Sequence, residues 1–411
     1  MSDAIIVLNA GSSSLKFSIY GVEDAELVLQ ARGQMEGVAG TPHFSATDRH
    51  GRVLADLVNS SSAEFRATTH WGHTEAFNYL ARWLRDQFSG DLNPVAVGHR
   101  VVHGGAAFAE PTLLTTEVIS RLAQLAPLAP LHQPHNLACI HSVTRLRPDL
   151  PQVACFDTAF HRGRAAVAEH FGLPESLFLS GVRRWGFHGL SYDSIARRLP
   201  ALAPEIVHGR VIVAHLGSGA SLCAMRDGKS VDTTMGFSVL DGLPMGTRCG
   251  SLDPGVLLYL LRNGMDVHGL ETLLYHKSGL LGMSGVSNDL RDLLASDRPS
   301  AAQAIDYFVY RIVKEVGSMA AVLGGMDGIV FTAGIGEHSP VIRKRVCDGL
   351  KWLGVVVDDS ANARGSGRIS VEGKTPSAWV IPTDEEAVIA QGTMEVVSPR
   401  GEATAAGFNN G

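Results

Sequence analysis

The sequence lacks the features that mark two large classes of protein. Its 35 Lys and Arg residues nearly balance 41 Asp and Glu, and a net charge of −6 offers no basic surface for nucleic acid. The longest run without these charged residues, 122–144, contains three prolines, which excludes a membrane-spanning helix there. We therefore expect neither a nucleic-acid partner nor a membrane partner.

Cysteine is scarce and unpatterned. The five cysteines are an odd number, and no two form a CxxC pair, so the sequence predicts neither a disulfide framework nor a zinc site. The first residues show no basic segment followed by an apolar core and a small-residue cleavage site. These absences lead us to expect a cytoplasmic protein with reduced thiols.

The familiar phosphate-binding signatures are also missing. No GxxxxGK[ST] occurs, and neither of the two glycine-rich hairpin turns reads GxGxxG. No His, Asp or Glu spacing resembles HExxH, so no histidine is expected to bind a metal.

What the sequence does contain is strands alternating with helices, which predicts an α/β fold, and the length favours two or three domains. Strand-like runs lie at 5–8, 15–20, 95–102, 152–156, 211–216, 221–225, 328–334 and 379–382. Helices are expected over 301–323 and from an Asp253 cap to Gly264. The polar, Ser-rich stretch 45–68 predicts a surface excursion.

One hairpin pattern occurs twice. "IIVLNAGSSSLKF" (5–17) and "VIVAHLGSGASLCAM" (211–225) each run from an aliphatic strand through Gly11 or Gly217 into a second strand. Backbone N–H groups of such a turn, with its hydroxyls, form a concave set of donors for phosphate, and Lys16 adds charge. Small-residue hairpins are common, so it is the duplication that favours a phosphate-binding interpretation.

Five further stretches carry candidate site residues: "GHRVVHGG" (98–105), "FDTAFH" (156–161), "RWGFHGLSY" (184–192), "LPMGTRCGSLDPG" (243–255) and "FTAGIGEHSP" (331–340). A single Arg or Asp more often makes a surface ion pair or a helix cap than a catalytic contact. An arginine between glycines, as at Arg100, has little neighbouring side chain to cover it.

Taken in their order along the chain, from residue 9 to residue 386, these motifs resemble those of the acetokinase family, also called acetate kinases. The resemblance implies an α/β, duplicated ribonuclease-H-like (actin-like ATPase) fold of two domains with an interdomain active-site cleft. It implies an N-terminal domain of 1–156 plus 388–411 and a nucleotide-binding domain of 157–387. It further implies a homodimer that transfers the γ-phosphoryl group of ATP to acetate, reversibly, giving acetyl phosphate and ADP.

The resemblance also implies roles for individual residues. Catalysis is expected from Arg100, Asp157, His188 and Arg248, and the acyl pocket from Arg100, Val102, Leu131 and Phe187. The nucleotide is expected to contact Asn9, Ser12, Ser14, Lys16, His215, Gly217, Ser218, Gly219, Asp289, Arg291, Gly334, Ile335, Gly336, Glu337 and His338. Mg²⁺, or Mn²⁺ in its place, is expected at Asn9 and Glu385, with Asp157 on the substrate side.

These roles agree with elementary chemistry. A short carboxylic acid, like Asp and Glu side chains with pKa values of about 3.9 and 4.3, is already ionised at neutral pH, so no general base is required. What must be supplied is attraction between two anions and stabilisation of charge on the phosphoryl oxygens, which arginines, a lysine and a cation provide.

The sequence departs from the usual family pattern in four places: Ser218 replaces Asn, "RCGSLDP" (248–254) replaces "RSGDIDP", Val239 replaces Pro, and His338 replaces Asn. Two alternatives stay open. One is a kinase of propionate or another short acid, because one methylene changes binding by only about 1 to 3 kcal/mol. The other is a non-enzymatic, actin-like nucleotide switch, which would have no use for two arginines and an apolar wall.

Overall fold

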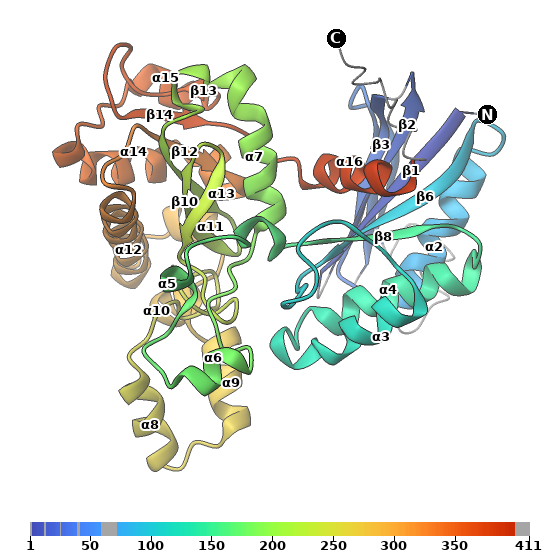
Figure 1. Ribbon diagram of the computed structural model, residues 1–411. Helices are drawn as coiled ribbons and strands as arrows, with labels where there is room; N and C mark the ends of the chain where they lie inside the picture. Colours follow the sequence, from blue (N-terminus) through green and yellow to red (C-terminus); the bar gives the residue numbers. More distant parts are fainter. Residues whose placement is uncertain (1, 12–13, 25, 39–41, 59–71, 399–411) are drawn as a thin grey trace, which may run out of the picture. The chain divides into compact units, whose positions relative to one another are not determined.

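A computed structural model describes residues 2–11, 14–24, 26–38, 42–58 and 72–398. Contacts divide the chain into two compact units. Unit 1 comprises the chain up to Val102, Glu110–Phe156 and the chain from Glu386 onward, and unit 2 comprises His103–Ala109 and Asp157–Glu385. Each unit is built on one mixed β-sheet with helices packed against it (Figure 1).

The sheet of unit 1 has the strand order β5-β4-β3-β2-β1-β6-β8-β7. Its strands are β1 (Ser2–Ala10), β2 (Ser14–Glu23), β3 (Glu26–Glu36), β4 (His43–Asp48), β5 (Val53–Val58), β6 (Leu92–Val101), β7 (Thr112–Leu113) and β8 (Gln152–Phe156). Strands β1 to β5 pair antiparallel, whereas β6 lies parallel to both β1 and β8. Strand β7 closes the edge antiparallel to β8.

The sheet of unit 2 repeats this plan in the order β11-β10-β9-β12-β14-β13. Its strands are β9 (Arg210–Leu216), β10 (Ala220–Arg226), β11 (Lys229–Thr233), β12 (Gly328–Thr332), β13 (Gly367–Arg368) and β14 (Ser377–Val380). Three antiparallel strands, against five in unit 1, are followed by the same two parallel steps and antiparallel edge. The expected α/β class and the duplication are therefore confirmed.

Helices cover both faces of the sheet in unit 1. They are α2 (His73–Gln87), α3 (Thr116–Gln124), α4 (Gln133–Leu146) and α16 (Glu385–Val397). Val97 of β6 lies in the apolar cluster that includes Phe77 of α2 and Val143 of α4. The next residue, Gly98, faces the opposite way, where an added Cβ would lie 2.3 Å from Oγ1 of Thr393 on α16.

The helices of unit 2 are α5 (Ala166–Glu169), α6 (Glu175–Leu179), α7 (Gly189–Leu202), α8 (Pro254–Arg262), α9 (Val267–His276), α10 (Gly279–Ser284), α11 (Leu290–Leu294), α12 (Pro299–Leu323), α13 (Ala333–His338), α14 (Pro340–Gly349) and α15 (Asp359–Arg364). Short 3₁₀ helices lie at Ala126–Leu128, Ala159–His161, Pro204–Ile206 and Lys351–Leu353. Helices α7 and α12 flank the central strands (Figure 1).

Local sequence explains where the predicted helices begin and end. The predicted 301–323 helix is α12, with Pro299 in its first turn and Gly324 in the left-handed conformation at its end. Asp253 caps α8 as expected, since its side chain accepts a hydrogen bond from the backbone N–H of Gly255. No helix in the described part of the chain combines the length and apolarity needed to cross a bilayer.

The surface excursion predicted for 45–68 is wrong in its first half. Residues 43–48 and 53–58 form β4 and β5, which extend the sheet of unit 1 beyond β3. Phe44 and Ala46 alternate with polar residues and are almost fully buried, which is the pattern of a half-buried strand. Residues 59–68 lie outside the described residues.

Candidate active site

The first glycine-rich hairpin joins β1 and β2 as the sequence predicts. Asn9 pairs with Lys16 across the hairpin, and the backbone N–H of Gly11 donates to the carbonyl of Ser14 over 2.8 Å. Asn9 and Lys16 are therefore close to one turn, together with Ser14. Ser12 lies outside the described residues.

Arg100 reaches this hairpin from the neighbouring strand. Strands β1 and β6 run parallel with Leu8 opposite His99, so Arg100 follows directly beside Asn9. Its Nη1 donates to Asn9 Oδ1 over 3.2 Å, and Asn9 Nδ2 donates to Glu386 Oε1 over 3.4 Å. Glu386 follows Glu385 directly in the sequence, and nothing in its local sequence marks it as a site residue.

The donor set around Asn9 suits a divalent cation of the Mg²⁺ type. Asn9 supplies an amide oxygen, and Glu386 of helix α16 supplies a half-buried carboxylate within the same unit. Glu385, the first residue of α16, is also half-buried. Such cations are commonly held by one or two carboxylates together with substrate phosphates and water, rather than by a complete protein cage. Among the described residues, no three His, Cys, Asp or Glu side chains are grouped so that they could hold a metal ion.

The three apolar residues expected in the acyl pocket are largely covered. Val102, just after β6, and Phe187 are each about 1% exposed, while Leu131 is half-buried. Val102 and Leu131 belong to unit 1, and Phe187 belongs to unit 2.

The second glycine-rich hairpin joins β9 and β10, and histidines pack beside it. The backbone N–H of Gly217 donates to the carbonyl of Gly219 over 3.0 Å. His188 and His215 stack with ring centroids 4.2 Å apart. The Nδ1 of His188 shares a 2.8 Å hydrogen bond with Ser221 Oγ, which fixes its ring.

Arg248 lies at this hairpin as well. A Cβ added at Gly219 would lie 3.1 Å from Nε2 of His188 and 3.8 Å from Nη1 of Arg248. Arg248 Nη1 also donates to the carbonyl of Val239 over 3.3 Å. The structure of unit 2 thus brings His188 and Arg248, which are distant in the sequence, to the hairpin that carries His215 and Gly219.

Hydrogen bonds join the two ends of the loop that carries Arg248. The N–H of Ser251 donates to the carbonyl of Gly242 over 2.9 Å, and Ser251 Oγ donates to Asp241 Oδ1 over 2.7 Å. Ser251, a departure from the family pattern, therefore has a structural role here. Ser218, another departure, accepts a hydrogen bond from the backbone N–H of Gly246 over 3.3 Å through its own carbonyl.

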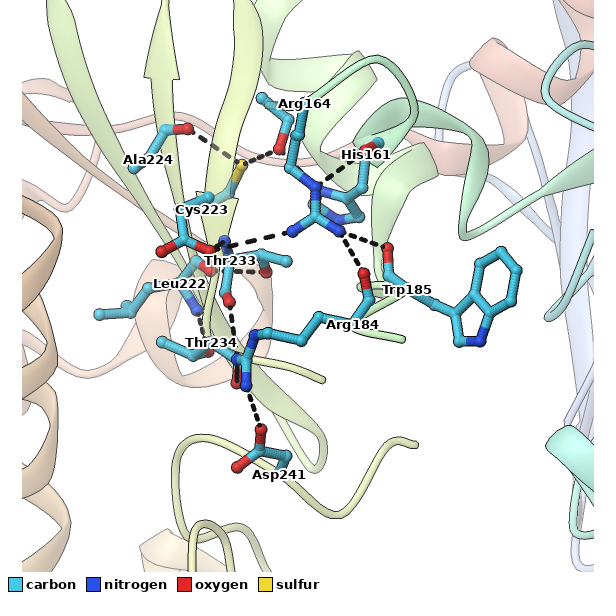
Figure 2. Close-up of polar contacts among 12 residues, drawn as sticks. His161, Arg164, Arg184, Trp185, Leu222, Cys223, Ala224, Thr233, Thr234 and Asp241 are labelled. Atoms are coloured by element: carbon cyan, nitrogen blue, oxygen red, sulfur yellow. Dashed lines mark hydrogen bonds and ion pairs between the residues drawn. The ribbon is translucent and has the colours of Figure 1, made fainter. Parts of the chain in front are cut away.

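Two arginines, the buried Arg164 and the half-buried Arg184, hold the segment that contains Phe187 and His188. Figure 2 shows Arg164 donating to the carbonyls of His161, Arg184 and Trp185, with its side chain fully buried. Arg184 Nη1 lies 3.1 Å from Asp241 Oδ2, so the same segment is tied to the loop that carries Arg248 (Figure 2).

His161 supports this segment as a neutral side chain. Its Nε2 shares a 2.9 Å hydrogen bond with the carbonyl of Phe187. Burial, reinforced by the nearby Arg164 charge, lowers the pKa of His161 to about 3. Asp157 is buried at the start of unit 2, and its carbonyl accepts the N–H of Gly189 over 2.8 Å.

Apart from the two hairpins, the residues expected near the nucleotide fall in two places in unit 2. Strand β12 ends at Thr332, and the predicted strand to Gly334 is wrong because Ala333, with a φ of +64°, begins helix α13. Glu337 Oε1 accepts the N–H groups of Ala333 (2.8 Å) and Thr383 (3.2 Å), so this carboxylate links the start of helix α13 to the segment at residue 383. His338 at the end of α13 is largely exposed.

The second place is the start of helix α11. Asp289 caps the helix by accepting the N–H of Arg291 over 2.8 Å. Its carboxylate also pairs with the exposed Arg291 guanidinium, and these hydrogen bonds lower the pKa of Asp289.

Comparison with known proteins decides the family. A sequence model of the acetokinase family matches residues 4–391. The chain belongs to the acetokinase family. It is 51% identical to an acetate kinase of Rhodopseudomonas palustris over 397 residues, covering 95% of this chain and 98% of that protein.

Two solved structures of acetokinases are similar over nearly the whole chain. A propionate kinase from Francisella tularensis has a TM-score of 0.85 at 34% identity, covering 96% of this chain and 100% of that one. The acetate kinase of Porphyromonas gingivalis has a TM-score of 0.82 at 36% identity, with the same coverage.

Membership confirms the resemblance, the fold class and the class of reaction. This acetokinase is a kinase that takes ATP and a carboxylate, in a family that needs a divalent metal. A non-enzymatic nucleotide switch is thereby set aside. The assignments of individual site residues stay predictions.

Proposed function

We propose that this acetokinase transfers the γ-phosphoryl group of ATP to acetate, reversibly, in a single in-line step. An acetate oxygen forms a bond to the γ-phosphorus while the bond from that phosphorus to the β–γ bridging oxygen breaks, giving acetyl phosphate and ADP. The observation that carries the proposal is the duplicated hairpin, each copy with its own guanidinium. Arg100 bonds to Asn9 at the first, and Arg248 lies beside Gly219 at the second.

Two guanidinium groups match what this reaction needs. Acetate and the γ-phosphoryl group are both anions at neutral pH, so their approach must be offset by positive charge. A planar guanidinium can donate two parallel hydrogen bonds to carboxylate or phosphoryl oxygens. We propose that Arg100 and Arg248 act on the same phosphoryl group, with His188 and Asp157 lining the site.

We propose that the domains 1–156 plus 388–411 and 157–387 divide the substrates between them. The first would supply the phosphate hairpin of Asn9, Ser12, Ser14 and Lys16, with Val102 and Leu131 for the acyl group. The second would supply Phe187 and the nucleotide contacts: His215, Gly217, Ser218, Gly219, Asp289, Arg291, Gly334, Ile335, Gly336, Glu337 and His338. Support for the second set comes from the clustering of its hairpin residues around Gly219.

We propose Mg²⁺ as the metal, with Mn²⁺ able to replace it, held by Asn9 and Glu385. When bound, such a cation would neutralise charge on the phosphates. The hydrogen bond from Arg100 orients the Asn9 amide so that its oxygen faces the guanidinium, and Glu386 accepts from the amide nitrogen. Both contacts therefore fix Asn9 in place.

A second candidate function is a kinase of propionate or a longer acid. Its support is the likeness to the propionate kinase structure, together with Val239 where the family usually has Pro. One added methylene changes transition-state binding by about 1 to 3 kcal/mol, so the two activities differ in degree.

Trapping of acyl phosphate with hydroxylamine tests both candidates. The enzyme, ATP and Mg²⁺ are incubated with acetate, propionate or butyrate, and the acyl hydroxamate is measured. We expect the highest kcat/KM with acetate. A higher value with propionate would make it a propionate kinase, and ATP hydrolysis without any hydroxamate would contradict the proposal.

Replacing each arginine tests the residue assignment. Arg100→Ala and Arg248→Ala are each expected to lower kcat by at least ~10²-fold, since one such charged donor contributes about 3 to 4 kcal/mol in well-studied oxyanion sites. Exposed Arg147 and Arg364 provide matched control substitutions in units 1 and 2. A folded variant with near-normal turnover would remove that arginine from the mechanism.

We also propose a homodimer formed through helices α8 and α9. Neither helix has a buried residue within the chain, although both are rich in leucine. Leu258, Tyr259 and Val267 are 53%, 65% and 75% exposed. Covering such an apolar surface is favourable, at about 25 cal/mol per Å².

Sedimentation tests this surface: the native chain is expected to be a dimer and the Tyr259→Asp variant a monomer. An equally stable Tyr259→Asp dimer would exclude α8 from the interface.

A cytoplasmic location is also proposed, because all five cysteines, each within the described residues, are free thiols.

A further inference from the structure

A buried asparagine connects the two strand ends that carry Asn9 and Arg100. Asn136 lies on helix α4 and is only about 1% exposed. Its Nδ2 donates to the carbonyl of Ala10 over 2.8 Å, and its Oδ1 accepts the N–H of Val102 over 3.1 Å. Ala10 is the last residue of β1, and Val102 follows the last residue of β6.

These contacts continue the pairing of β1 with β6 beyond its end. The parallel register of the two strands extends to Leu8 opposite His99. Asn9 and Arg100 come next, and their side chains meet over 3.2 Å. The carboxamide of Asn136 then bonds one backbone group on each strand, as a peptide group of an intervening strand would.

The orientation of the carboxamide is fixed by its partners. A backbone carbonyl requires a donor and a backbone N–H requires an acceptor. Turning the amide over would place its oxygen against the carbonyl of Ala10 and its NH₂ group against the N–H of Val102. Because Ala10 and Val102 are themselves buried, water cannot easily replace either bond.

We propose that Asn136 is a positioning residue for phosphoryl transfer. It holds Asn9 and the hairpin turn at a set distance from Arg100 and from the acyl-pocket residue Val102, without touching a substrate itself. This inference rests on the proposed roles of Asn9, Arg100 and Val102.

The same helix supplies a matched control. Gln133 is also fully buried, and its Nε2 donates to the carbonyl of Leu122 over 3.2 Å. Gln133→Ala and Asn136→Ala therefore remove a buried carboxamide from neighbouring turns of α4. The second change removes the hydrogen bonds to Ala10 and Val102.

Steady-state kinetics of these variants test the proposal. We expect Asn136→Ala to lower kcat about tenfold or more and to raise KM for acetate, because misplacing reacting groups by about 1 Å can cost 10²-fold. The KM for ATP and the kcat of Gln133→Ala should stay within about twofold of the native values. Thermal unfolding of both variants reports any shared loss of stability.

Asn136→Asp provides a second measurement that does not depend on the alanine variant folding well. A protonated Asp can donate to Ala10 and accept from Val102, whereas the ionised form opposes the Ala10 carbonyl. Burial raises the pKa of a carboxyl group. The ratio of Asn136→Asp kcat to native kcat should therefore rise as the pH is lowered from about 8 to 6.

The outcomes separate this inference from the proposed function. If Arg100→Ala keeps normal turnover, the proposed function fails at that residue. If Arg100→Ala is inactive while Asn136→Ala matches Gln133→Ala in kcat and in KM for acetate, the positioning role alone is wrong. A pH-independent ratio for Asn136→Asp would contradict it as well, even if the alanine variant does not fold.

Discussion

Adding one methyl group at Gly219 should slow turnover without unfolding the protein. The backbone of Gly219 is not in the left-handed region, so alanine fits its conformation. The new Cβ would lie 3.1 Å from Nε2 and 3.3 Å from Cε1 of His188, about 0.5 Å inside ordinary contact distance. The ring cannot simply retreat, because it stacks on His215 and bonds to Ser221.

The size of the effect follows from that displacement. If a 1 Å misplacement costs about 10²-fold, a shift of about 0.5 Å costs about tenfold in kcat, or ~1.4 kcal/mol in the barrier. The assay is acetyl hydroxamate formation at saturating ATP and acetate, with thermal unfolding measured in parallel. Gly172→Ala is the control, because nothing lies within 4 Å of its added Cβ. A Gly219→Ala kcat within twofold of the native value would refute the reasoning.

Three further outcomes are expected. Burial lowers the pKa of His99 to about 4, against about 6.5 when unfolded, so its neutral form contributes stability above pH 6.5 that is lost as the pH falls toward 4. The free energy of unfolding, measured with urea, should be lower at pH 5 than at pH 7.5, and this difference should be smaller in His99→Asn. The loss from His99 alone reaches up to about 3 kcal/mol near pH 4. Cys249 is the one half-buried thiol and burial raises its pKa, so a disulfide reagent should label a single cysteine slowly, and Cys249→Ser should abolish labelling. A double-mutant cycle of Arg184→Met and Asp241→Asn should give a coupling energy of about 1 kcal/mol in unfolding and a lower kcat for each single variant, whereas additive effects would contradict the ion pair's role.

Features set by neighbouring residues could be predicted from the sequence. Both hairpins follow from aliphatic runs ending in glycine and serine, and the start of α8 follows from Asp253 and Pro254. Strands β4 and β5 were missed because serine content outweighed the alternation of Phe44 and Ala46 with polar residues. That alternation was the available signal.

Contacts between distant residues could not be predicted in this way. Asn136 is 126 residues from Ala10 in the sequence, and Glu386 is 377 residues from Asn9. Nothing in their local sequence indicates these partners, because each meeting depends on the order of strands in the sheet. The stacking of His188 on His215 is of the same kind.

Helix α16 lies at the end of the described chain but packs on the sheet of unit 1, and this affects how the protein folds during synthesis. Its residues Ile389 and Thr393 cover Gly98 and Cys155 in the sheet of unit 1, yet they are translated only after all of unit 2. The nascent N-terminal portion therefore leaves the ribosome with one sheet face bare. The middle of the polypeptide can finish folding first, and chaperones would have most to protect on the earlier-made half.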